Sequence, residues 1–195
     1  MKFIIYSFIL LFSCFYSFII IAKTGIVTGL DIPRFVSLKS NDANLRIGPS
    51  INYPIEIKYV KQNLPIEIIE EFDVWRKVKD YDNNIGWLHK SLIKGDRYVL
   101  IKNTGLVDKK IYNRPNGKLI GLIQQNNILK LKKCLLDWCY VFTKDLKGWI
   151  LKNDIWGVYN KEIYNKSFIQ PLINQYWKLL NFINLFNEYN QRNLT

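Results

Sequence analysis

The residues of this chain with the most chemical potential are Cys134, Cys139 and His89. A cysteine peptidase needs a thiolate, a nearby base and a group that orients the base. Either cysteine together with His89 would supply the first two. The cysteines are separated from each other by only four residues, whereas His89 lies in a different copy of the repeat described below. We therefore expect the cysteines to bond to each other rather than to act as nucleophiles.

Metal and carboxylate chemistry are also poorly supported. Two cysteines in a C-x4-C arrangement resemble half of a zinc site, but the chain has no second pair and His89 is its only histidine. We expect no metal and no cofactor. Glycoside cleavage needs two facing carboxyl groups, and the candidates are Glu67, Glu70, Glu71 and Asp73. Because acidic and apolar residues alternate here, we interpret the glutamates as the solvated face of a strand and expect no enzymatic activity.

The N-terminus predicts export. Met1 and Lys2 precede an apolar run from Phe3 to Ala22, which is followed by Lys23. A basic start, an apolar stretch and a small final residue are typical of a secretory signal, so residues 1–22 are predicted to be a signal peptide cleaved after Ala22. The run is also long enough to span a membrane, which leaves an uncleaved helix over residues 3–22 as a membrane tether. Both alternatives predict a periplasmic location, with or without attachment to the inner membrane.

Export makes a disulfide between Cys134 and Cys139 the expected state. They form an even pair beyond the predicted signal segment, and disulfides persist in oxidising compartments. The bond would stabilise its own copy of the repeat.

The net charge of +12 does not by itself predict a nucleic-acid partner. It comes from 28 Lys and Arg against 16 Asp and Glu, with Lys far commoner than Arg. Ile, Asn, Lys, Tyr and Phe are abundant together, and these residues share A/T-rich codons. Genome composition therefore accounts for much of the basicity, and we expect no nucleic-acid binding.

Short strands separated by turn residues fill the segment from Phe35 to Ile93. Predicted strands cover Phe35–Leu38, Asn44–Ile47, Ile55–Val60, Pro65–Glu70, Trp75–Lys79 and Ile85–Leu88. No window in this segment has clean helical periodicity. The pattern predicts a small all-β barrel or sandwich.

The same unit occurs twice. Trp75 and Gly86-Trp87 match Trp138 and Gly148-Trp149, and the second tryptophan follows the first by twelve positions in one copy and by eleven in the other. We expect each pair to lie on adjacent antiparallel strands, with Trp87 and Trp149 in the cores and with glycine allowing close approach of a facing strand. Glu70 and Arg76 are predicted to occupy the places that the cysteines take in the second copy.

The motifs resemble a known family. Asn44–Pro49, Tyr53-Pro54, Trp75 and Gly86–His89 resemble the bacterial SH3-like domain family. More closely, Pro33–Lys39, the tandem copies, the cysteines of the second copy and Trp156–Tyr159 resemble a group of exported SH3-like proteins of alphaproteobacteria. The opening motif is degenerate in the second copy, where Tyr112–Pro115 replaces it.

This resemblance implies two tandem SH3-like β-barrels, at residues 34–95 and, in divergent form, 97–159. It also implies a non-catalytic binding module of the bacterial envelope, with a cell-wall peptide or an extended protein segment as partner. SH3-type folds bind extended peptides in shallow aromatic grooves. The candidate ligand-binding residues are Arg46, Tyr53, Phe72, Trp75 and Tyr81. Arg46 would pair with a carboxylate through its planar guanidinium; the competing interpretation is that it ties its own loop to backbone carbonyls.

The C-terminal tail, residues 160–195, lies outside the resemblance. From Ser167 the apolar residues follow a helical period, with a stripe at Ile169, Leu172, Ile173, Tyr176, Leu180 and Ile183. This predicts an amphipathic helix that packs on the second barrel, self-associates through residues 167–190 or lies on a membrane. The polar face of this helix is rich in Asn and Gln, which argues against a position on a membrane surface. The tail gives the alternative function, a structural or assembly partner of envelope proteins.

Overall fold

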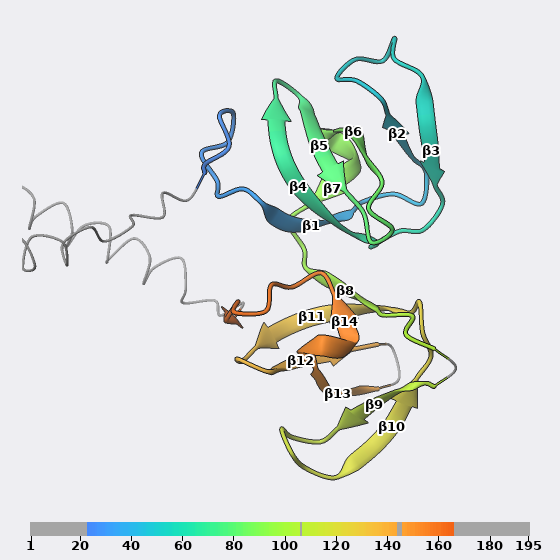
Figure 1. Cartoon of the computed structure of the whole chain (residues 1–195), viewed down its shortest axis with the longest axis vertical. Coiled ribbons are helices and arrows are strands. Elements are labelled where there is room, and N and C mark those ends of the chain that lie inside the picture. The colour runs from blue at the N-terminus through green and yellow to red at the C-terminus, as the bar shows by residue number, and fades with distance from the viewer. Residues whose placement is uncertain (1–22, 106, 144–145, 166–195) are drawn as a thin grey trace, which may run out of the picture.

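Two antiparallel β-sheets, one after the other along the chain, make up the protein (Figure 1). The computed structural model describes residues 23–105, 107–143 and 146–165. The predicted signal segment, residues 1–22, and the predicted helix at 167–190 lie outside the described residues. Within the described residues, no helix has the length and apolar character needed to cross a membrane.

The first unit is a sheet of seven strands. Its elements are β1 (Arg34–Leu38), β2 (Ala43–Arg46), β3 (Ile55–Tyr59), β4 (Pro65–Phe72), β5 (Trp75–Lys79), β6 (Ile85–His89), the 3₁₀ turn η1 (Lys90–Leu92) and β7 (Ile93–Lys94). The strand order is β3-β2-β6-β5-β4-β1-β7. The end strands β3 and β7 do not pair with each other in the described sheet, so this unit is an open sheet rather than the closed barrel predicted.

The second unit repeats this order. Its elements are β8 (Tyr98–Ile101), β9 (Lys109–Tyr112), β10 (Leu119–Ile123), β11 (Ile128–Cys134), β12 (Trp138–Phe142), β13 (Lys147–Leu151), the 3₁₀ turn η2 (Lys152–Asp154), β14 (Ile155–Trp156) and β15 (Tyr164–Asn165). The order is β10-β9-β13-β12-β11-β8-β14, and β15 adds to β11. It too is open among the described strands. The two tryptophan pairs lie on equivalent hairpins, β5–β6 and β12–β13, as the repeat predicts.

The period-2 alternation of each strand places one set of side chains in a core. In the first unit this set includes Leu38, Leu45, Ile66, Ile68, Val78 and Leu88. In the second unit it includes Val99, Ile111, Leu129, Val141, Ile150 and Ile155. Burial of each such side chain contributes about 1.5–3 kcal/mol. Two small aliphatic cores therefore hold the molecule together.

Trp87 is buried, as predicted, with 9% of its surface exposed, whereas Trp149 is only half-buried; neither belongs to the aliphatic core of its unit. Each precedes a fully buried residue, Leu88 or Ile150, and successive side chains of a strand point to opposite faces. Both indoles therefore lie on the outer face of their sheet. The expected role of the preceding glycine is confirmed, because a Cβ on Gly86 would approach the backbone oxygen of Arg46 to 2.8 Å.

The hairpin β4–β5 of the first unit and the equivalent hairpin β11–β12 of the second each have a cross-strand pair of side chains next to the turn. In the second unit the predicted disulfide is present: Cys134 and Cys139 are register partners and are bonded. In the first unit the same position holds Glu71 and Arg76. The sequence comparison had placed Glu70 there. The correct residue is Glu71, four positions before the hairpin tryptophan, as Cys134 is.

Aromatic side chains join the two units. The ring of Phe35 in β1 lies 5.0 Å from that of Trp156 and 4.7 Å from that of Tyr159. The Tyr159 hydroxyl donates to Glu67 Oε1 at 2.9 Å, and Lys79 Nζ lies 2.7 Å from the other oxygen of this carboxylate. Burial and the neighbouring Glu67 charge raise the pKa of Tyr159 well above its ordinary value, so the phenol remains a donor.

A glycine permits this close contact. Gly157 has φ of 113°, and a Cβ there would lie 2.8 Å from the Tyr98 carbonyl oxygen. It would also lie 3.2 Å from Pro65 Cβ in the other unit. The segment from Trp156 to Tyr159 can therefore follow its path between the units only with glycine at this position.

Removing the disulfide should destabilise the second unit. A bond that closes so short a loop contributes about 2 kcal/mol. The Cys134→Ser, Cys139→Ser protein should lose about this much unfolding free energy in urea titrations. Reductant should lower the stability of the wild type equally and leave the double variant unchanged; an unchanged wild type would contradict the prediction.

Loss of the hydroxyl at the junction should weaken the contact between the units. Tyr159→Phe removes a hydrogen bond to a carboxylate and should cost about 1.5–3 kcal/mol, measured by calorimetry as a lower or newly split unfolding transition. Tyr98→Phe is the matched control, since the described residues form no hydrogen bond with its hydroxyl. Equal effects of the two substitutions would count against a specific role for Tyr159.

Candidate functional site

The outer face of the first sheet brings charged and aromatic side chains into one cross-strand row. Arg46 of β2 is the register partner of Trp87 in β6, which is the partner of Lys77 in β5. Lys77 is in turn the partner of Glu70 in β4. These four side chains point away from the core because their strand neighbours point into it.

Arg46 holds the loop that follows it and keeps part of its guanidinium free. Its Nη1 donates to the Tyr53 carbonyl oxygen at 2.6 Å, as the structural interpretation of Arg46 predicts. No other hydrogen bond of this guanidinium is formed with the described residues. The ring of Tyr53, itself 45% exposed, lies so close over Gly48 that a Cβ there would be 2.6 Å from it. Gly48 is therefore required for the Arg46–Tyr53 arrangement.

Phe72 and Trp87 extend this surface. Phe72 is 53% exposed, and its ring meets the indole of Trp87 edge-on at 6.5 Å. Lys77 Nζ lies 5.7 Å from the Trp87 ring and 3.2 Å from the Glu70 carboxylate. We call Arg46, Tyr53, Phe72, Lys77 and Trp87 the first-unit face. The sequence predicts Trp87 as a core residue; it is buried, but on the outer side of its sheet beside the exposed ring of Phe72.

Two predicted site residues do not extend this exposed face. Trp75 is the register partner of Phe72 and, like Trp87, is buried; its ring lies against His89 at 5.5 Å. Tyr81 lies at the junction of the units, 5.9 Å from Trp156.

Tyr81 lines a separate cleft of about 700 Å³ between the units. In this cleft the Tyr59 hydroxyl donates to the Asp80 carboxylate at 2.8 Å. Burial and this hydrogen bond raise the pKa of Tyr59 well above its ordinary value. Asn84 also donates to Asp80 through its backbone and its side chain. The carboxylate of Asp80 is thus occupied by partners within its own unit.

His89 has a local structural contact. Its Nδ1 lies 2.7 Å from the Ser91 hydroxyl and accepts from the Ser91 backbone N–H at the start of η1. His89 is the last residue of β6. Cys134 and Cys139 lie in the other unit and are bonded to each other. The described residues include no cluster of His, Cys, Asp and Glu side chains suited to hold a metal ion.

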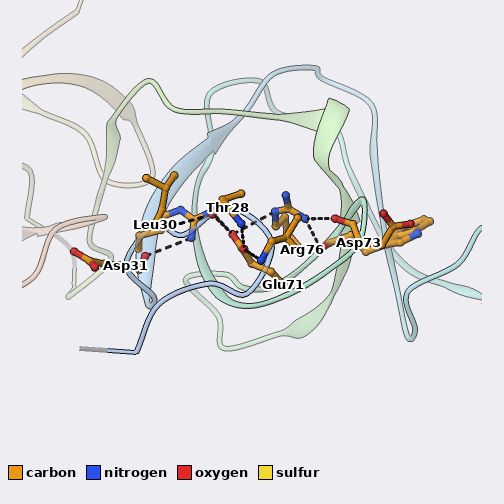
Figure 2. A network of polar contacts seen from close by, with 9 residues as sticks. Thr28, Leu30, Asp31, Glu71, Asp73 and Arg76 are labelled. Atoms are coloured by element: carbon orange, nitrogen blue, oxygen red, sulfur yellow. Dashed lines mark hydrogen bonds and ion pairs between the residues drawn. The ribbon is translucent and has the colours of Figure 1, made fainter. Parts of the chain in front are cut away.

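Glu71 is a buried carboxylate bound on several sides (Figure 2). One of its oxygens accepts from the backbone N–H groups of Val27 at 3.1 Å and Thr28 at 2.9 Å. The other accepts from the Thr28 hydroxyl at 2.7 Å and from Arg34 at 2.6 Å, and lies 3.6 Å from Arg76 Nε. A Cβ on Gly25 would collide with this carboxylate. The segment at residues 23–31 is therefore fastened across one end of the first unit.

These partners hold Glu71 ionised. Burial by itself would raise the pKa of this carboxyl group, but the hydrogen bonds from Arg34, from the Thr28 side chain and from the backbone outweigh it and lower the pKa to about 2. Such a group is unsuited to proton transfer near neutral pH. The interpretation of these glutamates as a solvated face is wrong for Glu67 and Glu71, which are 6% and 2% exposed. Their polar partners come from residues distant in the sequence.

Comparison with known proteins identifies the first unit. Residues 39–95 match the family model of the bacterial SH3 domain, so this part of the chain is similar to that domain. No curated protein matches the sequence.

Two solved structures from Trichomonas vaginalis are similar in part. NlpC1 has 10% identity and a TM-score of 0.29, covering 68% of this chain and 48% of its own. NlpC2 has 11% identity and a TM-score of 0.28, covering 64% and 48%. The chain spans about half the length of these structures, and likeness at this level carries no argument about function.

Acid should selectively remove the stabilisation due to Glu71. Its pKa is lowered by folding, so its contribution is complete above the ordinary value of 4.5 and is lost as the pH falls toward about 2. The expected loss is about 3 kcal/mol. Glu71→Gln should be less stable at pH 7 by a similar amount, and its unfolding free energy should fall less steeply between these pH values.

Glu70→Gln is the matched control for this comparison. Glu70 is the neighbouring glutamate in β4, and its half-exposed side chain pairs with Lys77 at the surface. Exposed pairs of this kind contribute about 0–1 kcal/mol. Parallel acid profiles for Glu71→Gln and the wild type would refute the assignment.

Proposed function

We propose that this protein is a non-catalytic binding protein of the bacterial envelope, which recognises a cell-wall peptide or an extended protein segment through its first unit. The observation that carries the proposal is an exposed face of aromatic rings and a partly free arginine on a bacterial SH3-like domain. Domains of this kind commonly bind cell-wall material. The ligand would lie across the outer surface of β2, β6 and β5.

The chemistry of the first-unit face favours a peptide with a carboxylate. Phe72 and Tyr53 offer exposed ring surface, which suits an extended chain in a shallow groove. The charge of Lys77 is balanced by Glu70. Arg46 is the remaining cation of the face, and its free N–H groups match the planar geometry of a carboxylate.

The non-catalytic part of the proposal rests on the partners of the reactive side chains. The two cysteines are used in a disulfide, and the ring of His89 is engaged with Ser91. Glu71 is held ionised by its hydrogen bonds. None of these groups is arranged as a nucleophile with its base.

The proposed location is the periplasm. There the protein would be either free, after removal of residues 1–22, or tethered to the inner membrane by residues 3–22. The apolar run of the sequence supports export. The Cys134–Cys139 bond supports an oxidising compartment.

Phe72→Ala should weaken binding of a soluble cell-wall stem tetrapeptide by about ten-fold, because it removes the most exposed aromatic ring of the face. The measurement is calorimetric titration of the full-length product purified from the envelope, with co-sedimentation on isolated peptidoglycan as a second readout. A peptide with its carboxyl groups amidated should bind less well, since it offers Arg46 no anion.

Leu135→Ala is the control for this substitution. Leu135 follows Cys134 as Phe72 follows Glu71, and it is 44% exposed in the second unit. It should leave peptide affinity unchanged. If Phe72→Ala binds the peptide as tightly as the wild type, the ligand does not occupy the first-unit face.

A further inference from the structure

A cleft of about 490 Å³ lies in the second unit beside Trp138, away from the first-unit face. Trp138 occupies the position in β12 that Trp75 occupies in β5. Trp75 is buried, whereas Trp138 keeps part of its indole exposed on the outer face of the sheet. The second unit thus presents an aromatic ring where the first unit covers one.

Neighbouring rings fix the orientation of this indole. Tyr112 of β9 meets Trp138 edge to face, with centroids 5.3 Å apart and planes at 90°. Tyr112 is also the register partner of Trp149, whose ring lies 5.3 Å from that of Tyr140. The indole therefore stands at the end of a row of aromatic side chains and offers a pre-oriented flat surface.

Uncommitted polar groups surround the indole. Asn116, Asn153 and Asn160 line the cleft, and their side chains form no hydrogen bond with the described residues. The same holds for the carboxylate of Asp137. Each carboxamide offers two N–H donors and an acceptor oxygen, so the cleft supplies both kinds of partner around one ring.

The one cation among the described residues that line the cleft is already occupied. Lys152 is 4% exposed, and its Nζ donates to the backbone carbonyls of Leu136, Asn160 and Glu162. These three bonds use all three ammonium protons. The described residues that line the cleft offer no free positive group to a ligand carboxylate, and Asp137 would repel one.

A cationic ligand is disfavoured as well, by the net charge of the chain. The chain carries a net charge of +12, which repels cations at long range. A neutral ligand rich in hydroxyl or amide groups, with a flat apolar surface of its own, meets the remaining requirements. The ring of a pyranose sugar has this combination, because its axial C–H groups form an apolar face and its equatorial substituents are polar.

We propose that the second unit binds a neutral sugar chain, with one pyranose ring stacked on Trp138 and its polar substituents bonded to the carboxamides of Asn116, Asn153 and Asn160. N-acetylated hexosamine units fit best, since an acetamide pairs with a carboxamide as both donor and acceptor. The inference rests on the proposed envelope function in that it names a second ligand class, the glycan, and a second site for it.

The test is titration of the full-length product with tetra-N-acetylchitotetraose, a glycan probe without peptide, by calorimetry and tryptophan fluorescence. Trp138→Ala should lower the affinity by about ten-fold or more. Asn153→Ala should lower it by about three- to ten-fold. Asn153 is exposed, and its side chain forms no hydrogen bond with the described residues. We therefore expect Asn153→Ala to leave the fold intact.

Trp75→Ala is the matched control, because it alters the equivalent position of the first unit and should leave glycan affinity unchanged. Equal glycan affinity of wild type and Trp138→Ala would overturn the proposal, as would absence of glycan binding by the wild type. Binding of the sugar-free stem tetrapeptide that depends on Trp138 would also overturn it, in favour of a peptide site. Since the probe contains no peptide, failure of the first-unit face would not affect this result.

Discussion

The cross-strand pair next to the turn of hairpin β4–β5, and its equivalent in hairpin β11–β12, is the constraint on which both units depend. In the second unit it is the Cys134–Cys139 disulfide, and in the first it is Glu71 opposite Arg76. The position faces the core side of the sheet at its end, where a small unit has little apolar surface to bury. In the second unit the disulfide joins the two strands and needs no further partner. In the first unit the buried carboxylate of Glu71 needs several hydrogen-bond donors, and these come from residues 23–34, which are thereby held against the sheet.

The strand pattern of the first unit could be predicted from the sequence because the signals are local. Alternation and turn residues located β1 to β6 to within a few residues, and the tryptophan spacing located the second copy. The disulfide followed from the even pair of cysteines. The sequence predicted closed barrels, whereas the described sheets are open. Pairing between the two end strands of a sheet depends on the curvature of the whole sheet, which no local pattern contains.

The buried glutamates could not be predicted from strand pattern. Glu71 is bonded to residues 37 to 44 positions away in the sequence, and Glu67 to Tyr159, which is 92 positions away. An alternating acidic strand has the same pattern whether water or such partners surround it. The burial of a charge was therefore decided by tertiary contacts that no local window contains.

The candidate site was partly predictable. Arg46 and Tyr53 were found because they belong to one short motif, and the structure joins them by a hydrogen bond. Tyr81 was grouped with them on residue type alone, yet its loop faces the other unit. Trp87 was assigned to the core on the grounds of its size; it is buried, but the alternation around Leu88 puts its ring on the other side of the sheet.

The junction built from Phe35, Trp156, Tyr159 and Glu67 has a consequence for polymeric ligands. Packed rings and a partly buried hydrogen bond hold the outer faces of the two units at one separation, unlike domains on a loose linker. Once one unit holds a polymer, the local concentration of its next segment at the other unit depends on whether the polymer's repeat matches that separation. The molecule would then discriminate by length as well as by composition, and fragments too short to reach both units would gain nothing from the second.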